Sequence, residues 1–382
     1  MKSFVPLLLA LAIGAGHAPQ AVAASSIHHA KAAKSAKAVK KAKVKATAAK
    51  AAPAPKRPAI DYEGEQVAFG EWQAVRDFED EMVSRHNFDR AALDALVAKT
   101  RFIDSAVQLV KPAPPGKPKN WQAYSERFVE PIRINAGVRF WNENAALLER
   151  AEAIYGVPAE IIVGIIGVET IYGRDTGRFR VVDVLTTLAF AYPESPNRND
   201  RMQFFRSELE KTLVLARKES IDPFSLLGSF AGAVGMPQFM PGNILKYGVD
   251  FDGDGIVDLR NSAADAIGSV ANFLVNHGWD RNATGPSVFP ADVAPSLAWE
   301  PLLGGLEARY EPAELRGAGV VTRTPLPEQR QYGLIDLQNG AAPTEYWVAN
   351  ANFFAITKYN RSYFYAMSVV ELGRAVRLAR GA

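Results

Sequence analysis

The sequence contains no cysteine among its 382 residues. Disulfide bonds are therefore excluded, and so is the lipid anchor that lipoproteins carry on a cysteine behind their signal sequence. Stability must come from a hydrophobic core instead. A chain of this length, in which 48% of the residues are hydrophobic, can build a sizeable core in more than one lobe.

The sequence also lacks an apolar run long enough to cross a membrane, which takes about 20 residues. An early run around Leu7–Ile13 is short, follows a basic start and precedes the small-residue site Ala21-Val22-Ala23. This order is typical of a secretory signal peptide, here over residues 1–23. We expect an exported, soluble protein in the periplasm.

Acidic residues are absent from residues 1–57, which carry eleven basic ones. The remainder holds 33 basic and 41 acidic residues, a net charge of −8. Residues 24–58 are low-complexity Ala/Lys sequence without an apolar face, which predicts a disordered linker that reaches on the order of 30 Å. Export argues against a nucleic-acid partner for this basic tail, so we expect a spacer with some affinity for anionic polymers of the cell envelope.

From Asp61 to about Thr284, apolar residues recur mostly at helical spacing. The predicted helices are Phe69–Ser84, Arg90–Lys99, Ser125–Tyr155, Ala159–Tyr172, Gln203–Lys218 and Asp265–His277, the last with Asp265 as its N-cap, and Pro112–Pro118 is a connector between helices. Residues 285–348 are richer in Pro and Gly and contain short β-like pieces at Gly319–Thr324 and Tyr332–Leu337, before Asn352–Arg380 returns to helix.

One carboxylate lies at the end of a very apolar stretch, residues 159–173, which reads AEIIVGIIGVETIYG. Pro158 and the run behind it predict a central, buried helix with Glu169 near its C-terminal end. A buried carboxyl group tends to raise its pKa and hold a proton, as a catalytic acid must. The alternative is a structural ion pair between Glu169 and Arg174 or Arg178.

Two further stretches suggest a sugar site. Gly228–Gly242, GSFAGAVGMPQFMPG, places the amide of Gln238 beside Phe239 and Met240 in an otherwise small-residue segment, although a tight helix-packing turn would look similar. Lys358–Tyr365 gathers three tyrosines and an asparagine, which indicates either core aromatics or a carbohydrate platform.

The stretch Asp250–Asp265, DFDGDGIVDLRNSAAD, matches the start of an EF-hand calcium loop. Its predicted ligands are Asp250, Asp252, Asp254, the carbonyl of Ile256, Asp258 and, as a late closing ligand, Asp265. Position 12, where a bidentate Glu belongs, is Asn261. A structural calcium ion in a variant loop is the expectation, and a mere acidic turn is the alternative.

Together these stretches resemble the membrane-bound lytic transglycosylase B family, glycoside hydrolase family 103, from about Tyr124 to Ala366. The resemblance implies a mainly α, α+β fold: a lysozyme-like catalytic core with an EF-hand-like loop, an α domain built from both chain ends, and a small β insertion. On this chain the α domain would be residues 59–148 completed by 350–382, the core 149–284 with its calcium loop 250–265, and the β region 285–349.

The resemblance also implies roles for individual residues. Glu169 falls on the family's lone catalytic acid/base. The positions that fall around the sugar subsites are Tyr124, Arg201, Phe204, Ser229, Gln238, Phe239, Met240, Phe273, Tyr359, Asn360 and Tyr365. Phe204 and Phe273 stand where tyrosines are common, which keeps stacking surface and loses a hydroxyl. No cofactor is implied for catalysis.

The implied reaction is cleavage of the β-1,4 bond between N-acetylmuramic acid and N-acetylglucosamine in peptidoglycan glycan strands. A lone carboxylate suffices if the muramoyl C6 hydroxyl attacks C1 and leaves a 1,6-anhydro end, whereas two-carboxylate glycosidases need a partner about 5–10 Å away. Two alternatives stay open: a hydrolytic muramidase with a second acid, such as Asp175, and a non-catalytic peptidoglycan-binding scaffold protein.

Overall fold

The computed structural model describes residues 60–112 and 118–381. The predicted signal peptide and Ala/Lys linker lie outside the described residues, and so do residues 113–117 of the proline-rich connector.

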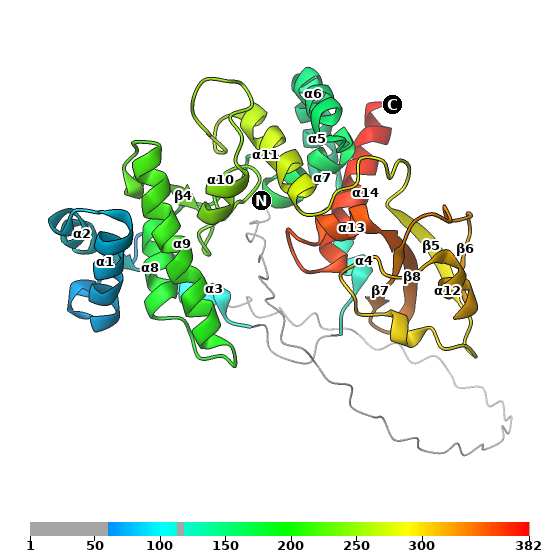
Figure 1. The fold of residues 1–382 in the computed structure, drawn as a ribbon, viewed down its shortest axis with the longest axis horizontal. Helices are drawn as coiled ribbons and strands as arrows, with labels where there is room; N and C mark the ends of the chain where they lie inside the picture. The colour runs from blue at the N-terminus through cyan, green and yellow to red at the C-terminus, as the bar shows by residue number, and fades with distance from the viewer. Residues whose placement is uncertain (1–59, 113–117, 382) are drawn as a thin grey trace, which may run out of the picture. The chain divides into compact units, whose positions relative to one another are not determined.

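Helices dominate the described chain (Figure 1). The α-helices are α1 (Gln73–His86), α2 (Arg90–Val97), α3 (Asp104–Val110), α4 (Trp121–Ser125), α5 (Pro131–Glu143), α6 (Ala145–Tyr155), α7 (Ala159–Thr170), α8 (Val181–Phe190), α9 (Arg198–Lys218), α10 (Pro241–Tyr247), α11 (Ala263–Asn276), α12 (Pro312–Gly317), α13 (Ala351–Ile356) and α14 (Tyr363–Arg380). Short 3-10 turns lie at η1 (Phe69–Glu71), η2 (Pro223–Ser225) and η3 (Glu300–Leu302).

Several helix boundaries differ from the sequence expectation, and two of the differences have a local cause. The predicted helix over 125–155 is divided: α5 begins at Pro131, where the Glu130 side chain accepts hydrogen bonds from two first-turn N–H groups, and α6 follows a break at Asn144. Helix α11 begins at Ala263, because Ser262 and not Asp265 is the N-cap. The expectation of Asp265 as the cap was wrong, and its side chain has another use described below.

Helix α7 is the centre of the fold. Every residue of it except Glu160 is buried, as its apolar sequence predicts. Helix α14 packs along it, and α5, α6 and α11 also contact it. The contact with α14 is very close, since a Cβ added at Gly164 would lie 2.3 Å from the carbonyl oxygen of Val369. The C-terminal helix is therefore part of the central packing, as Figure 1 shows for α7 and α14.

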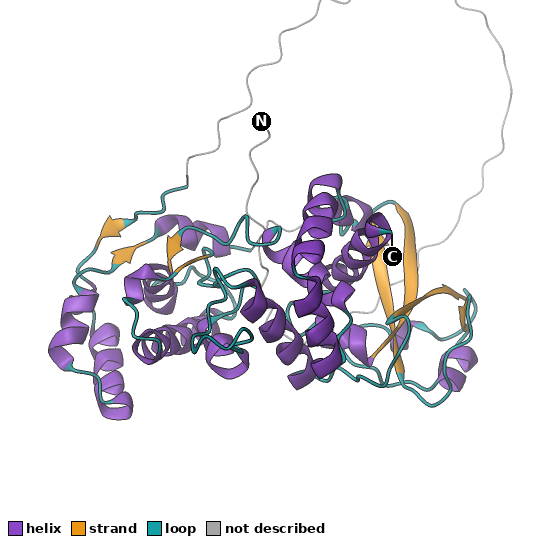
Figure 2. Cartoon of the chain, turned by 90° about the horizontal axis from the view of Figure 1, so that it is seen from above, coloured by secondary structure: helices purple, strands orange, loops and turns teal. Residues whose placement is uncertain are grey.

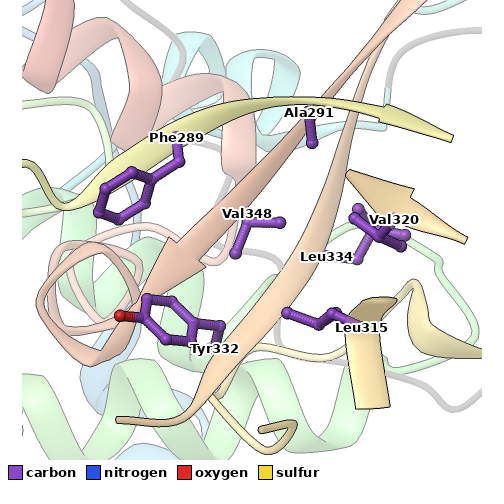
Figure 3. Close-up of a cluster of buried hydrophobic side chains, with 7 residues drawn as sticks. All are labelled: Phe289, Ala291, Leu315, Val320, Tyr332, Leu334 and Val348. Carbon is purple, nitrogen blue, oxygen red and sulfur yellow. The ribbon is translucent and has the colours of Figure 1, made fainter. Parts of the chain in front are cut away.

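The predicted β region is confirmed as a four-stranded antiparallel sheet, seen in Figure 2, with strand order β6-β5-β8-β7. Its strands are β5 (Val288–Val293), β6 (Val320–Thr322), β7 (Tyr332–Asn339) and β8 (Ala342–Asn350). Seven buried side chains form its core, drawn in Figure 3: Phe289, Ala291, Leu315, Val320, Tyr332, Leu334 and Val348. The β region therefore has a hydrophobic cluster of its own.

Two small antiparallel pairs complete the strands: β1 (Glu65–Gln66) with β2 (Arg101–Phe102), and β3 (Phe179–Arg180) with β4 (Leu227–Gly228). The second pair matters for the site, because β4 leads directly into the segment Gly228–Gly242. That segment folds back on itself through bridges from Val234 to Gly228 and to Phe239.

Within residues 60–112 and 118–381, no single helix has the length and apolar character needed to cross a membrane. Helices α6 and α7 together have the length and composition needed to cross a membrane, but they are bent by 116° at the break between them.

Candidate active site

Glu169 lies in the last turn of α7 and is 8% exposed. Its Oε1 accepts a hydrogen bond of 2.6 Å from the hydroxyl of Tyr365, near the start of α14. Burial raises the pKa of Glu169 from its ordinary 4.5 to about 7, and the Tyr365 hydrogen bond opposes this rise. The predicted alternative of an ion pair was wrong: Arg174 and Arg178 are exposed, and the hydrogen-bond partner found for Glu169 is a tyrosine. Glu169 can therefore hold a proton near neutral pH.

Two more tyrosines lie within the electrostatic reach of Glu169. Burial and the Glu169 charge raise the pKa of Tyr359 well above its ordinary value. Burial raises the pKa of Tyr124 to about 12, and Glu169 adds to that rise. The Tyr359 and Tyr365 rings stack with centroids 6.4 Å apart. The structure thus brings Tyr124, Tyr359 and Tyr365 together with Glu169.

Tyr359 also packs against the rings of Phe239 and Phe273, and we call these rings, together with that of His277, the aromatic wall. The Tyr359 ring centroid lies 5.8 Å from that of Phe239 and 4.6 Å from that of Phe273. Phe273 in turn stacks on His277 at 3.9 Å. The Tyr359 hydroxyl is buried and has no hydrogen-bond partner among the described residues. Phe239 and Phe273 therefore join the same group as the tyrosines.

The segment Gly228–Gly242 is attached to the end of α7. The Thr170 hydroxyl donates to the carbonyl oxygen of Met236 at 2.8 Å and accepts from the N–H of Gly173 at 3.0 Å. The N–H of Met236 then donates to the carbonyl oxygen of Leu259 at 2.8 Å. Thr170, for which the sequence predicts no role, therefore connects α7 to this segment and, through Leu259, to the acidic loop Asp250–Asp265.

Gln238 has a left-handed backbone conformation, with φ at 50°. Its amide nitrogen donates to the carbonyl oxygens of Thr176 at 3.2 Å and of Gly235 at 2.9 Å. These bonds fix the side chain, and its amide oxygen is the group left to accept from a ligand. Ser229 uses its hydroxyl to accept from the N–H of Ala233 at 3.0 Å. Met240 is buried and precedes α10 as its N-cap.

The backbone is strained directly behind the last turn of α7. Ile171 and Tyr172 have φ of 52° and 58°, a left-handed conformation that is rare for a β-branched or aromatic residue. A Cβ added at Gly167 or at Gly137 would lie 2.4 Å from the Tyr172 hydroxyl, so these two glycines make room for the ring. The strain holds because helices α5 and α7 enclose Tyr172 closely.

Arg133 of α5 supports the same turn. It is 7% exposed, and its Nε donates to the carbonyl oxygen of Gly167 at 3.3 Å, one of the last carbonyls of α7. Burial lowers the pKa of Arg133, and Glu130 and Tyr172 oppose that change. No local pattern marks Arg133 in the sequence, because the carbonyl group that it bonds is 34 residues away along the chain.

Three further predicted subsite residues lie on α9 and in the turn before α14. Arg201 and Phe204 lie on α9, where Arg201 acts electrostatically on Tyr192 and Phe204 packs edge-on against Phe205 at 5.2 Å. Asn360 follows Tyr359 in the turn before α14, and its carbonyl oxygen accepts from the N–H of Ser362 at 2.6 Å.

No second carboxylate shifts the pKa of Glu169, within the part of the chain that the structure describes. Asp175 is exposed, and its N–H donates to the carbonyl oxygen of Thr170. Asp183 is fully buried but paired with Arg180. Glu371 of α14 resembles Glu169 in having its pKa raised to about 7, mainly by burial, yet the charges that act on it are Glu345 and Arg374.

The acidic loop gathers carboxylates of Asp250, Asp252 and Asp254, whose oxygens lie within 4.8 Å of one another. Asp250 accepts hydrogen bonds from the N–H groups of Gly255 and Gly253, which together with other loop hydrogen bonds lower its pKa. Three hard oxygen donors at this spacing fit a calcium ion.

Asp258 and Asp265 lie outside that group of three. Asp265 is 1% exposed, and its two oxygens accept from the N–H groups of Phe251 and Asp258, each at 2.7 Å. Asp258 accepts from the N–H of Arg260 at 2.9 Å. The Ile256 side chain is exposed, with its N–H bonded to Asp254. Asp265 thus closes the loop by hydrogen bonds to its backbone.

Comparison with known proteins bears on this arrangement. The model of the transglycosylase SLT domain family matches residues 70–374. The chain is 42% identical over 315 residues to membrane-bound lytic murein transglycosylase B of Escherichia coli (strain K12), covering 80% of this chain and 83% of that protein.

Solved structures agree. The Escherichia coli lytic transglycosylase SLT35 in complex with calcium matches with a TM-score of 0.73 and 40% identity, over 84% of this chain and 97% of that one. SltB3 from Pseudomonas aeruginosa in complex with NAG-NAM-pentapeptide matches with a TM-score of 0.67 and 29% identity, over 81% of this chain and 79% of that one. The expected lysozyme-like lytic transglycosylase fold is confirmed, and the chain belongs to the transglycosylase SLT domain family of lytic transglycosylases.

Proposed function

We propose that this lytic transglycosylase cleaves the β-1,4 bond between N-acetylmuramic acid and N-acetylglucosamine in peptidoglycan and leaves a 1,6-anhydro-N-acetylmuramic acid end. The observation that carries the proposal is Glu169, a buried carboxyl group whose pKa of about 7 is set by burial and one tyrosine hydroxyl. The 42% identical relative from Escherichia coli is named a lytic murein transglycosylase, which supports the substrate class.

Glu169 acts first as an acid. With a pKa of about 7, roughly half of the molecules carry the proton at neutral pH. The proton passes to the glycosidic oxygen as the bond from that oxygen to the muramoyl C1 breaks. The Tyr365 hydroxyl then stabilises the newly formed carboxylate through its hydrogen bond of 2.6 Å.

Glu169 acts next as a base. The C6 hydroxyl of the same muramoyl residue attacks C1, its proton passes to the Glu169 carboxylate, and the enzyme returns to its starting state. One bond to C1 breaks and one forms, so no water is consumed. The negative end of the α7 dipole lies at this turn and favours the positive charge that develops on the sugar ring.

We assign the sugar contacts by chemistry. Tyr124 and Tyr359 offer aromatic faces for sugar rings, and the buried rings of Phe239 and Phe273 support that of Tyr359. The buried Tyr359 hydroxyl and the Gln238 amide oxygen offer hydrogen bonds. The remaining proposed subsite residues are Arg201, Phe204, Ser229, Met240, Asn360 and Tyr365.

We also propose that Asp250, Asp252 and Asp254 hold a calcium ion, with the Ile256 carbonyl, Asp258 and Asp265 as further candidate ligands. The 40% identical Escherichia coli enzyme solved in complex with calcium supports this. The ion would have a structural role, since the loop connects to α7 through Leu259, Met236 and Thr170. A periplasmic location and contact between the Lys-rich tail and anionic envelope polymers remain part of the proposal.

A hydrolytic muramidase is the less favoured reading, because Asp175 is exposed and no second carboxylate acts on Glu169 among the described residues. A non-catalytic scaffold would not need a protonated, buried Glu169.

The experiment compares Glu169→Gln with Glu371→Gln in the digestion of cell-wall sacculi. Both residues have a pKa raised to about 7, so Glu371→Gln controls for the loss of a carboxyl group with a raised pKa. We expect Glu169→Gln to lose at least about a hundredfold in rate, since acid–base catalysis contributes roughly 10²–10⁴-fold. We expect Glu371→Gln to stay active. A Glu169→Gln variant that digests sacculi at a third of the native rate would remove Glu169 from the mechanism.

A further inference from the structure

A pocket lies beside the turn at residues 358–361, which carries Tyr359. Its volume is about 390 Å³, and it is enclosed by the segment Pro301–Tyr310, by β7 at Gly333 and Leu334, and by Lys358 and Arg361. Leu334 is one of the sheet-core side chains in Figure 3. The Tyr363 hydroxyl donates to the carbonyl oxygen of Gly305, which ties the segment to α14. We call this space the loop pocket.

The loop pocket is positively charged although the folded body of the protein is acidic. Three cations line it, Lys358, Arg361 and Arg309, against one carboxylate, Glu307. Glu307 is already paired with Arg309 at 3.0 Å. Within the described residues, no carboxylate lies within ion-pair distance of Lys358 or Arg361, and both side chains are exposed. Two cations are therefore available to an anionic ligand.

Two cations of the loop pocket are also close along the chain to Tyr359, on which the charge of Glu169 acts. Lys358 and Arg361 flank Tyr359 and Asn360, so their Cα atoms lie within about 8 Å of that of Tyr359. Burial lowers the pKa of His277, which stacks on Phe273 in the aromatic wall, and the charges of Lys246 and Lys358 add to that change. The turn that places Tyr359 near Glu169 thus places two cations in the loop pocket.

The substrate of the proposed reaction carries an anion that can reach this place. Each N-acetylmuramic acid bears a peptide stem with free carboxylates, and a stem of about five residues spans up to roughly 17 Å when extended. Arginine binds a carboxylate through two parallel hydrogen bonds, and lysine acts as a point charge. The match is one of charge, stem length and pocket size.

On the basis of the proposed function, we propose that the loop pocket binds a carboxylate of the peptide stem, with Lys358 and Arg361 as the binding cations. The enzyme then prefers glycan that carries stems over glycan from which stems have been removed. The same chemistry could serve the lactyl carboxylate that remains on the sugar of stripped glycan, and the two substrates below distinguish these sources.

The test uses the full enzyme and two substrates: sacculi with intact stems, and the same sacculi after an amidase has removed them. The quantity measured is the ratio of kcat/KM on intact glycan to that on stripped glycan. We compare the native enzyme, a variant carrying Lys358→Met and Arg361→Gln, and the control Arg323→Gln, an exposed arginine outside the loop pocket.

We expect the double variant to lower the ratio by about tenfold or more, because hydrogen bonds to charged groups contribute at that level. About 0.5 M salt should bring the native ratio toward that of the variant, since exposed charges are screened. Arg323→Gln should keep the native ratio and its salt dependence.

Two outcomes would overturn the inference. In the first, the ratio stays at the native value in the double variant, either because neither rate changes or because both rates fall by the same factor through damage to the Tyr359 turn. In the second, the ratio rises because only the rate on stripped glycan falls, which would mean that the pocket binds the lactyl carboxylate. Failure of the proposed function looks different, because the native enzyme would then release no anhydro ends from either substrate.

Discussion

Removing one hydroxyl group, in Tyr365→Phe, tests how the pKa of the catalytic acid is set. The Tyr365 hydroxyl donates to Glu169 over 2.6 Å, and Tyr365 itself is fully buried. Phenylalanine keeps the ring and its packing but leaves the carboxylate without this donor. The hydrogen bond stabilises the charged form of Glu169, so its loss must raise the pKa above the native value of about 7.

The magnitude follows from the charge on the acceptor. A hydrogen bond to a charged group contributes about 1.5–3 kcal/mol, and one pKa unit corresponds to about 1.4 kcal/mol. The high-pH limb of kcat/KM, which reports loss of the proton from Glu169, should therefore move from near pH 7 to a value about one to two pH units higher. Below the limb the rate should fall only several-fold, because Glu169 becomes a weaker acid.

The assay is the pH dependence of sacculus digestion, from about pH 5 to pH 10, for the native enzyme and Tyr365→Phe. Tyr332→Phe is a matched control, since Tyr332 is equally buried but donates its hydroxyl to Pro327 in the β region. A limb that stays in place in Tyr365→Phe, or that moves to lower pH, would refute this account of the Glu169 pKa.

Three further results are expected. Folding raises the pKa of Glu169 from 4.5 to about 7, so this carboxyl group does not affect the stability of the fold below pH 4.5 and lowers it by about 3 kcal/mol above pH 7. In urea unfolding, the stability of Glu169→Gln relative to the native enzyme should therefore increase by that amount between pH 4 and pH 8.5, and an equal difference at both pH values would contradict this. Excess calcium should raise the melting temperature relative to chelator, and Asp252→Asn should reduce the shift, whereas identical melting curves would remove the metal site. Gly164→Ala should lower the stability of the fold by about 1–3 kcal/mol, because the added Cβ meets the backbone of Val369, although alanine favours helices. Gly317→Ala should not lower it, because Gly317 has open space around it, and equal stability of both variants would contradict the close packing of α7 and α14.

The sequence predicted α7 and its buried Glu169 well, because one uninterrupted apolar run leaves few ways to fold. It predicted the β region from composition, and the sheet of β5 to β8 confirms that. It did not predict the break at Asn144 between α5 and α6, since the apolar spacing continues across it. The periodicity of apolar residues indicates which face of a helix is buried, but it carries little information about where the helix is interrupted.

The residues that hold the last turn of α7 in place could not be predicted from the sequence either. Arg133, Thr170 and Tyr172 act through partners that are distant along the chain or through a left-handed backbone, and none of them has a local pattern. The role of Asp265 in the acidic loop could not be predicted from the sequence either. Its spacing suggested a cap or a ligand, but only the folded loop shows that both of its oxygens hold backbone N–H groups.

The central claim is that one carboxyl group, Glu169, carries out the whole reaction and that the attacking hydroxyl comes from the substrate. Digestion of sacculi in water enriched in heavy oxygen, followed by mass analysis of the muropeptides, tests it most directly. We predict unlabelled ends that are lighter by one water than a muramidase product and that resist borohydride reduction. Labelled, reducible ends as the main product would contradict the claim and would require a second catalytic acid such as Asp175.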